Sequence, residues 1–180
     1  MTTKFSIVII LIFSICSGCC ANNYYDLSGK TTDVYAKEVK KKYGLELIGK
    51  GDGTDDNIQY LILHFISRRK VDISQARVLY ISTFEGLLNK INKDEKIQPY
   101  LPNHPFTYKN VKMLMGFVDP NGNEYKDKAI ALVTIVKGNL VYAIEWGGIL
   151  KECHEESYED AFKIVHDSQQ IEKVDLGIGV

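Results

Sequence analysis

Hydrophobic residues follow a helical period in some segments of the chain and the two-residue period or compact apolar run of a strand in others. Three segments place apolar residues three and four positions apart, and they begin near Thr32, Asp72 and Glu155. Shorter apolar or alternating segments predict about five strands, at residues 45–50, 58–66, 111–118, 129–136 and 140–146. The pattern therefore predicts a chain that contains both helices and strands.

The longest helical segment has signals at both ends. Asp72 or Ser74 can cap its first turn, because a short polar side chain there accepts a hydrogen bond from a free backbone N–H. Pro99, Pro102 and Pro105 stop it, since proline lacks a backbone donor and biases the residue before it toward an extended conformation. We expect this helix to cover the sheet.

The elements follow the order α-β-β-α-β-β-β-α. Short turns connect the first two strands into a predicted hairpin and the last three into a meander that ends at Gly147-Gly148. A last helix is expected from Glu155 to Ser168, because acidic residues in a first turn favour the helix dipole. This order predicts an α+β fold, in which three helices pack on an antiparallel or mixed sheet of about five strands.

The first residues have the composition of a secretion signal. Lys4 precedes a short apolar block, and small residues follow that block up to Cys19. An apolar block of about ten residues is too short to cross a hydrocarbon core that needs roughly 20. A cleaved signal is therefore favoured over an uncleaved membrane anchor.

The end of this segment, Cys16-Ser17-Gly18-Cys19, resembles the lipobox of bacterial lipoproteins. In its usual form an aliphatic residue, a small residue and Gly or Ala precede the cysteine that receives diacylglycerol. Three of the four positions match, and the departure is Cys16, where Leu is commonest. The resemblance implies lipidation at Cys19. Ordinary cleavage after Ala21, which would leave a secreted chain, is the alternative.

Three parts follow from these patterns: a signal peptide at residues 1–18, a flexible tether at residues 19–31, and a single α+β domain at residues 32–180. The tether is inferred from polar composition without a hydrophobic period. The chain has 22 basic and 23 acidic residues, so it lacks the excess of positive charge typical of nucleic-acid-binding domains. We expect a monomer that does not bind nucleic acid.

The number and spacing of the cysteines argue against a disulfide framework and against a metal centre. Once Cys16 is removed and Cys19 is acylated, only Cys20 and Cys153 keep a thiol, which is too few for a disulfide framework. No two histidines or cysteines stand at metal-ligand spacing, and no motif implies a cofactor. Cys153 precedes His154 directly, but adjacent residues do not face each other on a helix, so we assign no catalytic residue.

Glu145, Trp146 and His154 form the candidate surface for a ligand or partner. An aromatic residue at a strand end next to two glycines can line a groove. Tyrosines in predicted loops, including Tyr108, supply further contact area suited to recognition.

The leading hypothesis is a non-enzymatic lipoprotein of the bacterial envelope, which binds or scaffolds an envelope protein or glycan and contacts the membrane through its lipid. The residue after Cys19 is Cys20. In enterobacteria an Asp at this position favours retention in the inner membrane. Its absence here favours the periplasmic face of the outer membrane in a Gram-negative host. An envelope hydrolase that uses His and carboxylate groups from loops is one alternative, and a secreted factor without lipid is another. Only an enzyme needs a cleft in which titratable groups converge.

Overall fold

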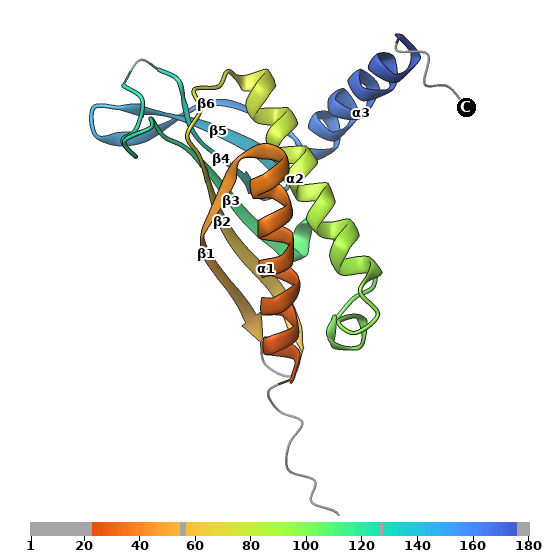
Figure 1. Ribbon diagram of the computed structural model, residues 1–180. Helices are drawn as coiled ribbons and strands as arrows, with labels where there is room; N and C mark the ends of the chain where they lie inside the picture. The colour runs from red at the N-terminus through yellow and green to blue at the C-terminus, as the bar shows by residue number, and fades with distance from the viewer. Residues whose placement is uncertain (1–22, 55–56, 127, 176–180) are drawn as a thin grey trace, which may run out of the picture.

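The computed structural model describes residues 23–54, 57–126 and 128–175. These residues form three α-helices and six strands, as Figure 1 shows. The elements are α1 Asn23–Tyr43, β1 Leu45–Thr54, β2 Ile58–Ser67, α2 Ile73–Lys93, β3 Val111–Phe117, β4 Ile130–Val136, β5 Asn139–Trp146, β6 Ile149–Ser157 and α3 Tyr158–Asp175, with short 3-10 helices at Gln98–Tyr100 and Tyr108–Asn110. The predicted α+β class is confirmed, and the sheet has one strand more than the sequence pattern indicated.

All six strands belong to one mixed sheet in the order β1-β2-β3-β4-β5-β6. Sequential strands pair antiparallel, except that β2 and β3 pair parallel. Parallel pairing needs a crossover connection, and α2 with the segment after it supplies that connection. The predicted hairpin and the predicted meander are therefore joined side by side into a single sheet.

The core lies between the helices and one face of the sheet. Figure 1 shows α1 and α2 lying across this face. On β2, the alternate residues Leu61, Leu63 and Phe65 are buried, whereas Ile62 and His64 between them are only partly buried. This two-residue alternation is the burial expected of a sheet whose helices pack on one side.

Helix α1 corrects the prediction of a tether at residues 19–31, because the chain is helical from Asn23 onward. Its early contacts to the rest of the fold are polar. Ser28 and Thr32 are buried, and Ser28 Oγ donates to the Asp52 carboxylate on β1 at 2.9 Å. The spacing of apolar residues does not reveal a helical segment whose buried side chains are hydrogen-bonded hydroxyls. Residues 19–22 lie outside the described part of the chain.

Helix α2 begins where the sequence indicated. Asp72 accepts a hydrogen bond from the Gln75 backbone N–H at 2.8 Å, and the Gln75 side chain accepts one from the Asp72 N–H at 3.1 Å. This reciprocal capping satisfies two donors that would otherwise lack partners. Tyr80, Phe84, Leu87 and Ile91 then recur on one buried face, which packs on the sheet.

Strand β6 and helix α3 correct the prediction of a helix from Glu155 to Ser168. Glu155 and Glu156 lie in β6, and α3 begins at Tyr158. The Asp160 backbone N–H donates to Ser157 Oγ at 3.0 Å, so Ser157 caps the true helix start. Most of β6 is an exposed edge strand that carries charged residues, and such a strand lacks the apolar pattern that marks buried strands.

Among the helices described here, none has both the length and the hydropathy that a bilayer crossing requires.

Candidate functional site

The turn between β5 and β6 carries a group of exposed apolar side chains. Trp146 ends β5 and is 50% exposed, and Ile149 and Leu150 begin β6 and are 66% and 48% exposed. We refer to Trp146, Ile149 and Leu150 as the hairpin tip. Trp146 pairs with Ile149 across the turn, whereas Leu150 pairs with Glu145 and lies on the other face of the hairpin. Adjacent exposed apolar residues such as Trp146 and Ile149 typically mark an interaction surface.

Glu145 and two glycines fix the shape of this turn. Gly147 and Gly148 have φ values of 64° and 86°, which are left-handed conformations that glycine adopts without a steric penalty. The Gly148 backbone N–H donates to Glu145 Oε1 at 2.6 Å. Glu145, predicted as part of a ligand surface, therefore holds its own turn in place.

Two lysines border the Trp146 ring. The distances from Nζ to the ring centroid are 4.9 Å for Lys128 and 5.9 Å for Lys151. An ammonium group near an aromatic face is attracted by the negative face of the ring. The face of the hairpin tip that carries Trp146 thus has a cationic border.

His154 lies away from the hairpin tip. It pairs in register with Tyr142, whereas Trp146 pairs with Ile149 at the turn. The His154 ring centroid is 5.3 Å from that of Tyr142, and His154 Nε2 is buried without a hydrogen-bond partner among the described residues. Trp146, Glu145 and His154 therefore do not form one continuous surface.

Cys153 lies at an irregularity of the β5–β6 pairing, where the register shifts between Tyr142 and Ala143. Its Sγ donates to the Tyr142 carbonyl at 3.4 Å. Partial burial raises the pKa of the thiol, and the Glu152 carboxylate raises it further. A raised pKa reduces the thiolate fraction at neutral pH, and thiolate is the nucleophilic form.

A partly buried polar cluster ties α2 to the last two strands. Arg77 Nε donates to Glu156 Oε1 at 2.8 Å, and the Tyr142 hydroxyl donates to the same oxygen at 2.5 Å. The hydrogen bond to Glu156 raises the pKa of Arg77. Burial raises the pKa of Tyr142, and Glu156 adds to this effect. The cluster satisfies its own hydrogen bonds, so it is a structural contact between elements.

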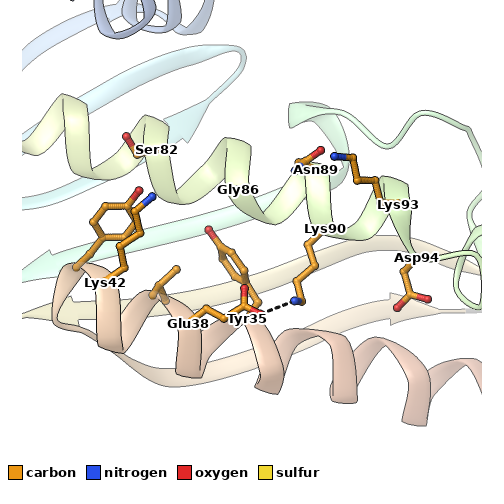
Figure 2. Close-up of a pocket in the computed structure, with 11 residues that line it drawn as sticks. Tyr35, Glu38, Lys42, Ser82, Gly86, Asn89, Lys90, Lys93 and Asp94 are labelled. Atoms are coloured by element: carbon orange, nitrogen blue, oxygen red, sulfur yellow. Dashed lines mark hydrogen bonds and ion pairs between the residues drawn. The ribbon is translucent and has the colours of Figure 1, made fainter. Parts of the chain in front are cut away.

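A groove of about 580 Å³ runs between α1 and α2. Figure 2 shows side chains of the two helices facing each other across it, with the Tyr35 ring directed at Gly86. Lys90 Nζ lies 2.6 Å from Glu38 Oε1, and this ion pair bridges the two helices. The Tyr35 hydroxyl donates to the Thr83 carbonyl beneath it. The best-defined contacts in this groove therefore join the helices to each other.

The hairpin tip and the start of α1 lie at opposite ends of the domain (Figure 1). The bond from Ser28 to Asp52 places the start of α1 beside the end of β1. Since β1 and β2 are antiparallel, while β5 runs in the same direction as β2, β5 ends at the other end of the sheet. Trp146 is the last residue of β5, so it is remote from the beginning of the helix.

Sequence reasoning found Trp146 but missed Ile149 and Leu150, which it left between the meander and the last helix. A signal was present, because two adjacent glycines between apolar residues favour a tight hairpin turn. The exposure of these side chains could not be anticipated, since it depends on the position of β6 at the edge of the sheet that the described residues form.

Within the described ranges, there is no group of three or more His, Cys, Asp or Glu side chains that could hold a metal ion. The chain matched no protein-family model, no curated protein and no solved structure.

Proposed function

We propose that this chain is a lipid-anchored protein of the bacterial envelope whose folded domain binds a partner protein through the hairpin tip. The observation that carries the proposal is the exposure of Trp146 and its register partner Ile149 at a turn made by two glycines. Tryptophan is enriched among the residues that contribute most to protein–protein binding. Binding, not catalysis, is the proposed role.

The position of the tip favours a protein over the membrane as its partner. Cys19 is the proposed lipidation site, and α1 begins at Asn23, so the lipid would attach near the start of α1. A helix of 21 residues is roughly 30 Å long, and the tip lies toward its far end. The domain would thus present Trp146 to a partner away from the bilayer that holds the anchor.

The anchor is tested on the native protein. Mass spectrometry of the mature N-terminus should find a diacylglycerol-modified Cys19, and Cys19→Ser should release the domain from the membrane fraction. A mature chain that begins at Asn22 without lipid would overturn the anchor.

The partner surface is tested by site-specific photo-crosslinking in the intact envelope. A photoreactive residue at Ile149 should give a protein adduct, and Trp146→Ala should reduce that adduct about tenfold or more. Ile48 on β1 is the matched control, because it is also isoleucine and is 54% exposed on the opposite edge of the sheet. Equal adducts from both positions, or an adduct unaffected by Trp146→Ala, would overturn the role of the hairpin tip.

A further inference from the structure

A second groove, of about 560 Å³, lies between α2 and α3. Its walls come from both helices and from the segment that leads into β3. The lining residues are Glu85, Leu88, Asn89, Asn92, Phe106, Thr107, Tyr108, Tyr158, Glu159 and Phe162. The volume lies within the range of known ligand pockets, and one side of the groove is open to solvent.

Aromatic rings form one wall of this groove. The ring centroids of Tyr108 and Tyr158 are 4.8 Å apart, and those of Tyr158 and Phe162 are 6.3 Å apart. The face of an aromatic ring carries negative charge density and attracts cations. Lys109 already illustrates this, since its Nζ lies 5.9 Å from the Tyr108 ring centroid.

Two carboxylates give the groove its charge. Among the described residues that line it, Glu85 and Glu159 are the charged ones, and none is Lys or Arg. The Tyr158 hydroxyl donates to Glu85 Oε1, and this bond orients the carboxylate. On the other side, burial and the neighbouring Glu159 carboxylate raise the pKa of Tyr108. Both tyrosines therefore stay neutral at physiological pH, and the carboxylates keep free acceptor sites.

The groove is also held in shape before any ligand binds. Asn92 Nδ2 donates to the Phe106 carbonyl at 2.9 Å, and the Phe106 N–H donates to Asn92 Oδ1 at 2.7 Å. These two bonds fix the segment that carries Tyr108 against α2. A site that is rigid in the free protein loses less conformational entropy on binding.

We infer that this groove binds the Arg or Lys side chain of an extended peptide segment. The cationic group would lie between Glu85 and Glu159, and its aliphatic stem would pack on Leu88 and Phe162. Negative charge and aromatic faces on one groove are the chemistry that complements such a side chain. The open side of the groove leaves room for the peptide main chain, whereas a small free cation would remain largely in water. This inference is independent of the lipid anchor and of the hairpin tip.

The test uses the full chain in detergent and two synthetic tripeptide amides, N-acetyl-leucyl-arginyl-leucinamide and its neutral citrulline analogue. Calorimetric titration should give saturable binding of the arginine peptide and at least tenfold weaker binding of the citrulline peptide, because a hydrogen bond to a charged group contributes about 1.5 kcal/mol or more. Glu159→Gln and Phe162→Ala should each weaken the arginine peptide about tenfold.

Glu38→Gln is the matched control, since Glu38 lines the other groove. Its affinity for the arginine peptide should equal that of the unsubstituted chain, and far-UV circular dichroism confirms that each variant is folded. Glu159 is exposed, so Glu159→Gln keeps the test valid even if Phe162→Ala unfolds. The inference would be overturned if the two peptides bound equally or if no saturable binding were found. It would also be overturned if Glu38→Gln weakened binding as much as Glu159→Gln, or if free arginine amide bound as tightly as the arginine peptide.

Discussion

Arg77 on α2 and Glu156 on β6 form an ion pair at 2.8 Å whose side chains are only 14% and 10% exposed. The two residues are 79 positions apart in the sequence. The Tyr142 hydroxyl donates to the same carboxylate oxygen, so one partly buried acceptor connects helix α2, strand β5 and the edge strand β6. This contact secures the strand that the sequence pattern did not reveal.

Breaking this pair should destabilise the domain. Arg77→Met leaves a partly buried carboxylate without its cation, and because the pair keeps some contact with solvent the loss should be at most about 3 kcal/mol. Glu156→Gln should also destabilise, and the double variant should lose less than the sum of the two, because neither charge is then left alone. Urea unfolding of the four proteins measures the coupling. Additive losses would show that the two side chains do not interact.

The Tyr35 hydroxyl should make glycine the only residue that fits at position 86 without a clash. A Cβ at position 86 would lie 2.6 Å from the Tyr35 hydroxyl oxygen, which is held by its bond to the Thr83 carbonyl. Gly86→Ala should therefore lower the free energy of unfolding by about 1 kcal/mol or more, although alanine favours a helix.

Tyr35→Phe provides the test of this mechanism. Without the hydroxyl, the nearest Tyr35 ring atoms lie 3.4 Å from the added Cβ, so Gly86→Ala should become neutral or stabilising. Gly51→Ala is the control, because no atom lies within 4 Å of its added Cβ. Urea unfolding distinguishes the outcomes, and an equal loss in both backgrounds would contradict the mechanism.

Alkaline pH should unfold the domain through its buried tyrosines. Burial is the main cause that raises the pKa values of Tyr35, Tyr80, Tyr142 and Tyr158 in the folded state. Above the unfolded pKa of about 10, the unfolded chain loses these protons while the folded chain retains them, so stability falls as pH rises. Urea midpoints and tyrosinate absorbance should show this loss beginning near pH 10. A constant midpoint would contradict it.

Cys153 should react slowly with iodoacetamide at neutral pH. Its pKa is raised by partial burial and by Glu152, so little thiolate is present until the solution becomes alkaline. The alkylation rate should be below that of a free cysteine peptide and should increase steadily with pH. Cys153→Ser should leave the fold and the biological phenotype intact. Rapid alkylation, with loss of function in a folded serine variant, would instead favour the hydrolase alternative.

The glycine turn should tolerate asparagine better than alanine. Gly147 and Gly148 have positive φ values, and Asn adopts the left-handed conformation more readily than Ala does. Gly147→Asn should be nearly neutral, whereas Gly147→Ala should cost about 1 kcal/mol. The fluorescence of Trp146, the single tryptophan of the chain, reports unfolding directly. Equal stability of the two variants would indicate a different turn conformation.

The sequence predicted those elements whose hydrophobic pattern and end signals agree. Asp72, one of the two predicted caps, caps helix α2. Strands β2, β3, β4 and β5 lie where the apolar runs placed them, because a buried face requires apolar residues at a fixed period. The α+β class follows from the order of these elements. Trp146 was identified as a surface candidate by the same local reasoning.

Only the tertiary structure decided what depends on partners distant in the chain. Ser28 and Thr32 are buried because hydrogen bonds satisfy their hydroxyls, and a polar pattern alone resembles a tether. Strand β6 carries charged residues, and it is held in the sheet by pairing with β5 and by the bond between Glu156 and Arg77. The groove between α2 and α3 likewise combines Tyr108 and Glu85 from separate segments. Local periodicity records which face of an element is apolar, whereas long-range pairing determines which polar residues meet and which apolar residues stay exposed.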